Sequence, residues 1–565
     1  MKKVGKFILW MIGIVLVLEI VVITVGYFSK RIGQDTVLTL RLEGEIAEQA
    51  PGDGLASILG GPQNTVTEVV EALDRASRDA RITGLELRVV DPALGMANLQ
   101  EIRQKIREFN RAGKFSVAYL EYGTNRTYYL ASACKTVVLL PTSLLHLHGL
   151  MASSTFLRGT FDKLGIYPDF YHIGDYKNAS NIFTEKKYTP AHREATQALL
   201  DDFSGQFAQG VAESRNMKAD DVAALIAKGP FTAPEALSSK LVDRVSYADE
   251  VRELVKQKNH GSDSRLSVAE YFRRTERKGR SKLAVIYATG DILPGRSSRS
   301  PWGGTMMGSD TIAEQFKRAR EDSSVKAVVL RVDSPGGVAF ASEAMRRELL
   351  LTKREKPVVV SMSDVAASGG YWIAMSANKI VAEPGTITGS IGVLTGKLNL
   401  LGLYEKLGLS KDQIATTDNS TIDYPFQNFT PGQRESILKY MHEIYGNFLQ
   451  GVAEGRKMNV AAVDKIAQGR VWSGARAKQL GLVDELGGMD TAIAAAKNLA
   501  KIPAGEQVAL VYLPPPRGLV EKIRDLVDGA SVMTPSVAAL RWMERIEALA
   551  RIPAWTVLPA VPEIQ

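Results

Sequence analysis

The sequence predicts an α/β protein in which two copies of one unit follow each other along the chain. In the second half, apolar β-branched segments alternate with segments of helical periodicity, a pattern typical of a largely parallel sheet covered by helices. Short segments of the first half also recur in the second half in the same order, which indicates a tandem duplication. At 565 residues, the chain is long enough for two domains that each bury a core.

The composition is that of a globular protein and argues against nucleic-acid binding, intrachain disulfides and a metal cluster. Hydrophobic residues make up 45% and charged residues 23% of the chain, as in ordinary globular proteins. The net charge of +8 is small for this length, and no basic segment is interleaved with aromatic residues, so we expect no nucleic-acid binding. The single cysteine, Cys134, excludes an intrachain disulfide and provides no metal-binding cluster. We therefore expect neither a metal nor another cofactor.

The first 34 residues predict a membrane anchor. Residues 7–28 are apolar apart from Glu19, and at about 1.5 Å per residue such a helix crosses a hydrocarbon core of about 30 Å. The apolar core of a cleaved signal peptide is shorter, about 7–15 residues, and ends at a site of small residues. Here the run ends with Tyr27 and Phe28, and Ser29, Lys30 and Arg31 follow instead of such a site, so the anchor is expected to stay uncleaved. Slightly more positive charge before the run than after it favours a cytoplasmic N-terminus and an extracytoplasmic body at the inner membrane.

Six pairs of similar segments define the repeat. Each pair is separated by 241 to 246 residues, and the order of the pairs is the same in both halves. The pairs begin or end at Glu43 and Thr289, Leu87 and Leu330, Lys135 and Lys379, Lys163 and Lys406, Gly210 and Gly451, and Leu241 and Leu482. We expect a first repeat at 35–253, a basic linker at 254–280, a second repeat at 281–500, and a C-terminal strand with an amphipathic tail at 501–565.

The elements of the second repeat follow one another as strand and helix. Residues 283–290, 326–334 and 356–364 are expected to be strands, because they are apolar and rich in β-branched residues. Residues 311–322 and 341–355 between them have helical periodicity, and a long helix is expected near the end of each repeat. Such alternation places the strands side by side and in parallel.

The segment from Val358 to Ala377 contains a candidate nucleophile, Ser368. An apolar strand leads into the turn AASGG, and an apolar helical segment follows. A serine at a helix N-terminus lies where backbone N–H groups favour developing negative charge, and neighbouring glycines let a substrate backbone approach. The alternative is a serine that merely caps the helix.

The repeats have lost complementary residues. Ser368 corresponds to Thr124, and the glycine pair Gly336-Gly337 corresponds to Ala93-Leu94. A glycine pair after a strand can supply N–H groups to an oxyanion, or it can simply form a turn. Conversely, Lys177 of the first repeat corresponds to Ser420 of the second. The first repeat therefore has the lysine without the serine, and the second has the serine without the lysine.

A lysine acts as a base only if its pKa lies well below about 10.4. Apolar neighbours of Lys177 are consistent with burial, but a surface lysine is the alternative. The sequence has no GxSxG motif, and His442, the one histidine inside the second repeat, lies in a helical segment. A Ser-Lys pair is therefore preferred over a Ser-His-Asp triad.

Taken together, these motifs resemble the signal peptide peptidase A (protease IV) family in its long, membrane-anchored form with two tandem repeats. The resemblance rests on VDSPGG from Val332, SDVAASGGYWIA from Ser363, TGSIGV from Thr388 and GDYK ending at Lys177, and it covers nearly all of residues 35–500. It implies a Clp/crotonase-like fold in each repeat. It also implies a serine endopeptidase with Ser368 as nucleophile and Lys177 as general base.

Further expectations follow from this resemblance. The oxyanion and substrate-binding groups are expected at Gly336, Gly337 and Gly369, and Ser390 is expected to line the site or orient Lys177, unless it is only a turn residue. The implied substrates are released signal peptides at the membrane, and the implied assembly is a homotetramer. An acyl-CoA enzyme of related fold and a non-enzymatic membrane scaffold are the alternatives. The predicted anchor argues against the first, and the complementary losses argue against the second.

Overall fold

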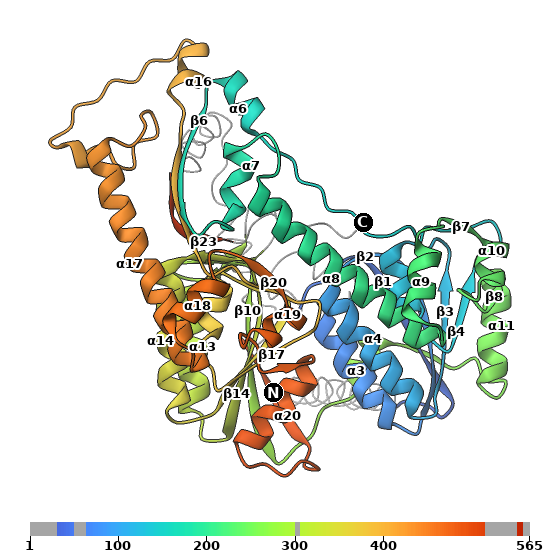
Figure 1. Cartoon of the computed structure of the whole chain (residues 1–565). Helices are drawn as coiled ribbons and strands as arrows, with labels where there is room; N and C mark the ends of the chain where they lie inside the picture. The colour runs from blue at the N-terminus through green and yellow to red at the C-terminus, as the bar shows by residue number, and fades with distance from the viewer. Residues whose placement is uncertain (1–30, 50–63, 300–304, 515–550, 558–565) are drawn as a thin grey trace, which may run out of the picture.

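The computed structural model describes residues 31–49, 64–299, 305–514 and 551–557 (Figure 1). The apolar run at residues 7–28, predicted to be a membrane anchor, lies outside this part of the chain. Among the described residues, no helix combines the length and the apolar composition that a membrane span requires.

The first repeat is built on a parallel sheet of six strands in the order β8-β4-β3-β2-β1-β9. The central strands bury most of their residues, as expected for strands covered on both faces. The strands are β1 (Thr36–Glu45), β2 (Ile82–Ala93), β3 (Phe115–Leu120), β4 (Thr136–Leu139), β8 (Arg244–Val245) and β9 (Arg265–Ser267).

The second repeat has the same strand order, β21-β17-β16-β14-β10-β22, so the duplication is also visible in the fold. All of these neighbours pair in parallel, and β18 with β20 extends the sheet beside the end of β16. The strands are β10 (Ser281–Thr289), β14 (Val325–Ser334), β16 (Val358–Ala367), β17 (Lys379–Ala382), β18 (Ile387–Gly389), β20 (Val471–Ser473), β21 (Glu485–Leu486) and β22 (Val508–Leu513). The predicted α/β class with two parallel sheets is confirmed.

Each repeat extends beyond its expected end by one edge strand. β9 lies in the segment expected to be a linker and pairs with β1, whereas β22 lies beyond residue 500 and pairs with β10. Arg265 and Val508, where these strands begin, are 243 residues apart, which matches the offset of the repeat. The two segments belong to the sheets because each forms main-chain hydrogen bonds with the edge of β1 or β10 that would otherwise be unpaired.

The helices of the two repeats also correspond. Those that contact the sheets are amphipathic and bury one apolar face, as the periodicity predicts. In the first repeat they are α3 (Val66–Arg78), α4 (Met96–Arg111), α5 (Asn125–Ala131), α8 (Pro190–Arg215), α9 (Ala219–Ile226), α10 (Ala233–Ser238), α11 (Ala248–Lys258) and α12 (Val268–Arg274). In the second they are α13 (Ser309–Glu321), α14 (Ala339–Lys353), α15 (Gly369–Ala374), α17 (Pro431–Arg456), α18 (Val460–Ile466), α19 (Gly474–Gln479) and α20 (Met489–Leu499).

A third sheet joins the repeats, in the order β12-β13-β11-β15-β23-β19-β6. β6 of the first repeat pairs antiparallel with β19 of the second, so the two repeats are linked by main-chain hydrogen bonds. Its strands are β6 (Tyr167–Ile173), β11 (Asp291–Leu293), β12 (Ser298–Arg299), β13 (Thr305–Gly308), β15 (Gly336–Val338), β19 (Val393–Asn399) and β23 (Arg551–Val557).

Beyond β6 and β19, the two repeats form a shared projection at the top of Figure 1. Helix α6 (Arg158–Leu164) lies beside α16 (Leu401–Lys406) there, because Gly165 and Gly402 allow their backbones to approach closely. The remaining short elements are β5 (Leu144–Leu145), β7 (Phe231–Thr232), α7 (Asn181–Thr184) and the 3₁₀ turns at Asn178–Ser180 and Asp418–Thr421. After β6, the chain leaves this projection and returns toward the second repeat.

Candidate active site

Ser368 lies between the end of β16 and the start of α15, as the sequence predicts. Its side chain is buried and its backbone has a φ of 55° and a ψ of −115°. A non-glycine residue with positive φ is strained, and the surrounding hydrogen bonds hold it: Ser368 N–H donates to Gly389 O at 2.8 Å, and Trp372 N–H donates to Ser368 O at 2.8 Å. The Ser368 hydroxyl makes no capping hydrogen bond to the helix that follows, so the alternative of a serine that merely caps the helix does not describe it.

Lys177 reaches the second repeat from the end of β6. Because β6 pairs with β19 over its whole length, the loop that follows β6 is delivered beside the segment that precedes β19. Tyr176 N–H donates to Gln468 O at 2.8 Å, which anchors the loop to the second repeat next to Lys177. Lys177 is completely buried, so the alternative of a surface lysine is wrong.

The structure brings the two predicted residues into contact. Lys177 Nζ lies 2.7 Å from Ser368 Oγ, although the residues are 191 positions apart in the sequence. Nζ also lies 3.0 Å from both the carbonyl oxygen and Oγ of Ser390. Two N–H bonds of a neutral amine can therefore be donated to Ser390, which leaves the nitrogen lone pair to accept the Ser368 hydroxyl proton.

Burial lowers the pKa of Lys177 well below its usual value near 10.5. Desolvation disfavours the ammonium form, and no carboxylate contributes to offset it. The neutral amine is thus favoured, which is the form that can accept a proton. A general base needs this lowered pKa, but the sequence alone does not show that Lys177 is buried.

Ser390 is the third member of this group. It is buried, has a φ of 51°, and its N–H donates to Arg470 O at 2.7 Å, so its carbonyl and hydroxyl are both held toward Lys177. The predicted role of orienting Lys177 matches this position better than that of a simple turn residue.

A glycine that the sequence did not single out makes room for the lysine. Gly469 has a φ of 74°, and a Cβ atom there would lie 2.6 Å from the Cα, Cβ and backbone nitrogen of Lys177. Gly174 is similarly confined, because a Cβ there would lie 2.3 Å from the carbonyl carbon of Gln468. The two backbones can pack this closely only because both positions are glycine. A glycine with positive φ leaves no periodic signal in a single sequence.

The predicted oxyanion glycines lie on β15, which packs against α15. Gly336 and Gly337 have φ values of 112° and 151°, and a Cβ at Gly337 would lie 2.2 Å from Ile292 O. Gly336 N–H donates to Ser334 Oγ at 3.2 Å. Gly369 is the first residue of α15, where helix N–H groups have no partner within the helix.

β23, the last described segment, lies between β15 and β19. It pairs antiparallel with β15, where Gly337 opposes Thr556, and antiparallel with β19, where Leu394 opposes Trp555. An extended segment therefore runs alongside the glycine strand that packs against the helix of Ser368. β23 belongs to the predicted amphipathic tail at 501–565, and this strand docks on the body of the chain.

The corresponding positions in the other repeat have ordinary structural roles. Thr124 caps α5, because its hydroxyl accepts the N–H of Thr127 at 3.2 Å, so it occupies the position of Ser368 without its environment. Ser420 is exposed and its hydroxyl contacts Thr416 and Thr417. One complete Ser-Lys pair is thus formed by the described residues at these four positions.

Comparisons with known proteins show the family of the chain. The sequence profile of peptidase family S49 matches residues 108–261 and 351–503. The chain is 34% identical to "Serine protease SPPA, chloroplastic" of Arabidopsis thaliana over 87% of this chain and 73% of that protein. It is also 34% identical to "Protease 4" of Salmonella typhi, over 83% of this chain and 77% of that protein.

Other matches cover a smaller share of the chain. "Putative signal peptide peptidase SppA" of Enterococcus faecium is 36% identical over 33% of this chain and 55% of that protein. Among solved structures, a mutant of ClpP1 from Listeria monocytogenes covers 37% of this chain and 94% of that one at 14% identity and a TM-score of 0.25, which adds nothing to the family match. Since the profile matches both repeats and relatives align over most of their length, the chain belongs to peptidase family S49 and is a serine peptidase.

Proposed function

We propose that this serine peptidase is a membrane-anchored endopeptidase that degrades released signal peptides, with Ser368 as nucleophile and Lys177 as general base. The observation that carries the proposal is the 2.7 Å contact between Ser368 Oγ and a fully buried lysine whose pKa is lowered. A lysine that stays neutral can activate a hydroxyl, as an adjacent base does in other covalent hydrolases. We also infer a Clp/crotonase-like fold for each repeat.

The proposed reaction proceeds in two steps. Lys177 takes the proton of the Ser368 hydroxyl as Oγ attacks the peptide carbonyl, and the ammonium then protonates the leaving amine. Water next attacks the acyl-enzyme with the same lysine as base, which releases the carboxylate product and restores the serine. Ser390 holds the amine in place throughout, because its carbonyl and hydroxyl accept the two remaining N–H bonds.

The oxyanion would be stabilised by backbone N–H groups of Gly337 and Gly369, with Gly336 shaping the same strand. Preorganised N–H donors of this kind typically contribute a factor of about 10² to 10³ in rate. The start of α15 adds the positive end of a short row of peptide dipoles. The glycines also let a substrate main chain pass close to the nucleophile.

Support for a peptide substrate in extended form comes from β23. A strand of this chain already pairs with both β15 and β19, so main-chain groups that can bind an extended peptide face one another across this position. Signal peptides are a suitable class because main-chain pairing accepts varied apolar side chains. The name of the Enterococcus faecium relative, a putative signal peptide peptidase, points to the same class of substrate.

The apolar run at residues 7–28 would hold the catalytic body beside the membrane in which such peptides are left. We further propose that the body lies on the extracytoplasmic side and that the chain forms a homotetramer. A reporter fused after Gln565 tests the orientation, since only an extracytoplasmic signal is compatible with it. Sedimentation of the detergent-extracted protein tests the assembly.

Hydrolysis of a synthetic signal peptide by wild type, Ser368→Ala and Lys177→Ala tests the catalytic assignment. We expect each variant to lose at least a factor of about 10² to 10⁴ in kcat while keeping its fold. Because the two residues act as a unit, the double variant should be little slower than either single one. A Lys177→Ala variant that keeps most of its turnover would refute the assignment. Labelling of wild type, but not of Ser368→Ala, by a serine-directed phosphonate is the matching chemical test.

A further inference from the structure

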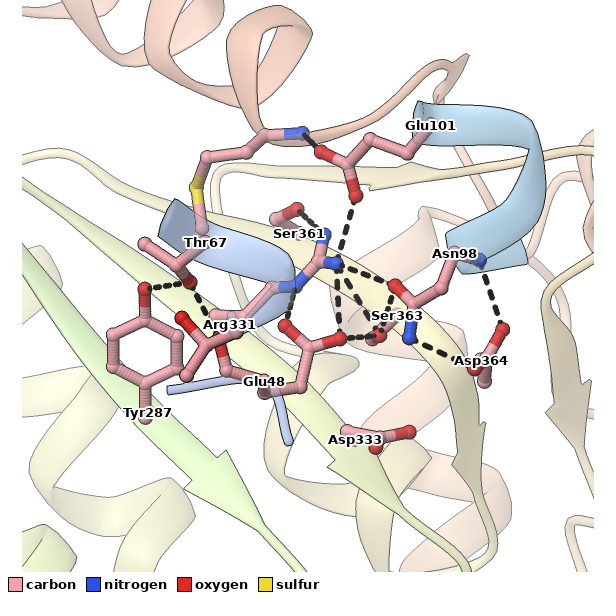
Figure 2. Close-up of polar contacts among 12 residues, drawn as sticks. Glu48, Thr67, Asn98, Glu101, Tyr287, Arg331, Asp333, Ser361, Ser363 and Asp364 are labelled. Atoms are coloured by element: carbon pink, nitrogen blue, oxygen red, sulfur yellow. Dashed lines mark hydrogen bonds and ion pairs between the residues drawn. The ribbon is translucent and has the colours of Figure 1, made fainter. Parts of the chain in front are cut away.

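A buried polar cluster joins the two repeats (Figure 2). We call it the junction network and define it as Glu48, Asn98 and Glu101 of the first repeat with Arg331, Ser363 and Asp364 of the second. Arg331 is almost fully buried and donates to Glu48 at 3.0 Å, to Glu101 at 2.8 Å and to Asn98 at 3.2 Å. Ser363 donates to Asn98 Oδ1 at 3.0 Å and also contacts Glu48. The network therefore crosses from one repeat to the other through several charge-assisted bonds.

Within this network, Asp364 has the simplest set of partners. Its carboxylate accepts three N–H groups, from the backbone of Gly95 at 2.8 Å, the backbone of Asn98 at 2.9 Å and the side chain of Asn98 at 2.8 Å. All three donors belong to the first turn of α4 or the residue before it, in the other repeat. A carboxylate at a helix N-terminus is favoured by the helix dipole as well as by these bonds.

The fit at this contact leaves no spare room. A Cβ atom at Gly95 would lie 2.4 Å from the Asp364 Cγ. Gly95 has a φ of −77° and a ψ of 178°, a conformation open to any residue, so glycine is needed here for space rather than for backbone freedom. The helix of the first repeat and the strand of the second are thus held at one separation.

Asp364 is also close to the nucleophile along the chain. It lies on β16 four residues before Ser368, and the intervening residues are the end of that strand. The next residue, Val365, donates its N–H to Asp333 Oδ1 at 3.1 Å, at the end of β14. Ser334 follows Asp333 and accepts the N–H of Gly336 at 3.2 Å. The strand ends tied by the junction network are therefore the ones that carry the nucleophile and the glycine pair.

Lys177 belongs to the same repeat as the donors of Asp364. The first repeat supplies Lys177, and the loop that carries it is anchored to the second repeat because Tyr176 N–H donates to Gln468 O at 2.8 Å. The pairing of β6 with β19 positions the lysine loop rather than the serine strand. Asp364 links the first repeat to the strand that ends at the serine.

We propose that Asp364 is a positioning residue for Ser368: its carboxylate ties the nucleophile strand to the N-terminus of α4 and so fixes the serine relative to the repeat that supplies Lys177. This inference rests on the proposed roles of Ser368 and Lys177. Asp364 touches neither of them, and its effect is transmitted through the backbone of residues 365–367.

The first repeat offers a matched control position. Glu121 is 243 residues before Asp364, at the end of β3, which corresponds to β16. Its side chain is 54% exposed and lies 3.8 Å from Arg88, the counterpart of Arg331. Glu121 is therefore a carboxylate at the corresponding position, but without a helix docked on it. Glu121→Gln removes the same charge as Asp364→Asn without removing such a contact.

The test is a cycle of variants in the full chain: Asp364→Asn, Asn98→Asp and the two combined, with Glu121→Gln as control. Asp364→Asn turns one acceptor into a donor that faces another N–H, and Asn98→Asp places two carboxylates against each other. We expect each to lower kcat for peptide hydrolysis about tenfold or more, with KM within about twofold of wild type. The combination restores a donor–acceptor pair between the two side chains, although one backbone N–H stays unpaired. It should therefore be several-fold more active than either single variant.

Gly95→Ala approaches the same contact from the other side. Its added methyl group pushes on the Asp364 carboxylate without changing any charge, and it should also lower kcat rather than raise KM. Glu121→Gln should keep wild-type kcat and KM. Thermal unfolding and gel filtration of every variant identify those that fail to fold. If a single variant fails to fold, the combined variant still tests the inference. Its activity recovers only if the hydrogen bond between positions 364 and 98 is restored.

Two results would overturn the inference. One is an Asp364→Asn variant that is folded and keeps at least half of wild-type kcat; the other is a folded combination no more active than the slower single variant. A failure of the proposed function is distinguishable from both, because wild-type hydrolysis would then not depend on Ser368 or Lys177. A change in KM alone, with kcat at the wild-type value, would also contradict positioning of the nucleophile.

Discussion

Burial of Lys177 decreases the free energy of unfolding, but it favours the neutral amine that catalysis requires. Its ammonium form is disfavoured by burial, and its neutral form is held by Ser368 and Ser390. In the unfolded chain the same lysine is protonated up to about pH 10.4. Folding therefore expels a proton from this side chain over the range between its lowered pKa and about 10.4, and the free energy of unfolding decreases as the pH falls through that range.

Lys177→Met tests this cost directly. The variant has a side chain of similar length without the amine, so it should lose activity by a factor of about 10² or more. It should also gain thermal stability relative to wild type, and the gain should increase as the pH is lowered from about 10 toward neutrality. Unfolding temperatures of both proteins across this pH range give the comparison. A difference that does not change with pH would contradict a neutral buried lysine.

Gly469→Ala tests the space that Lys177 needs. The added Cβ atom would lie 2.6 Å from the backbone of Lys177, and the position has a φ of 74° that alanine adopts at a cost of about 1–3 kcal/mol. We expect kcat to fall about tenfold or more, because the amine moves relative to Ser368. Gly446→Ala on α17 is the control, since nothing lies within 4 Å of a Cβ there. Equal activity of the two variants would show that this packing is not needed for catalysis.

At the level of elements, the pairing of β6 with β19 explains how residues of different repeats share one site. β6 comes from the first repeat and forms the end of the sheet whose other strands all follow residue 290. The segment after β6 carries Lys177 and the segment before β19 carries Ser390, and antiparallel pairing places these two ends side by side. The site is therefore built at a seam between repeats and not within either one.

Thr556→Pro tests the effect of β23 on substrate binding. Thr556 opposes Gly337 in the antiparallel pair, and proline removes the N–H and disrupts a strand. If β23 occupies the position that an extended substrate takes, freeing it should lower KM for short peptides several-fold, since occupancy reduces the fraction of binding-competent molecules. kcat should stay near wild type. Initial rates on a short fluorogenic peptide provide the measurement, and an unchanged or higher KM would indicate that β23 is part of the working structure.

For the whole molecule, docking of the two repeats confines several carboxyl groups at their interface. Glu383, next to the junction network, is 4% exposed and burial raises its pKa to about 8, with the charge of Glu101 adding to the effect. Burial likewise raises the pKa of Asp364 to about 6. Glu383 is thus stabilised in its protonated form, so ionising it works against docking. At Asp364 the backbone N–H groups of Asn98 and Gly95 offset part of the effect of burial.

Glu383→Gln tests this relation between docking and pH. The folded wild type keeps a proton on Glu383 up to about pH 8, whereas the unfolded chain releases it near pH 4.3. The contribution of this residue to the free energy of unfolding therefore falls as the pH rises from about 4 to about 8. Glutamine does not titrate, so its unfolding temperature should exceed that of wild type by a margin that grows between pH 5 and 8. A constant margin would mean that Glu383 is ionised throughout.

From the sequence alone we could predict the duplication, the α/β class with largely parallel sheets, and Ser368 and Lys177 as candidate catalytic residues. This was possible because periodicity, β-branched runs and the comparison of two copies are local or internal signals. Correspondence between the repeats was sufficient to show that one had lost a serine and the other a lysine. The sequence predicts a strand beyond residue 500, but it does not show that β9 and β22 complete the sheets of the repeats, because that is fixed by their pairing with β1 and β10.

The tertiary structure alone decided that the lysine is buried, that its amine touches the serine, and that the two repeats meet through the junction network. Distances between residues 191 positions apart depend on how whole sheets and helices dock, and no local pattern encodes such docking. The pKa of Lys177 follows from the same cause, since desolvation arises only when both repeats enclose the side chain. Chemistry at this site is thus specified by residues in the sequence but is created by the packing of one repeat against the other.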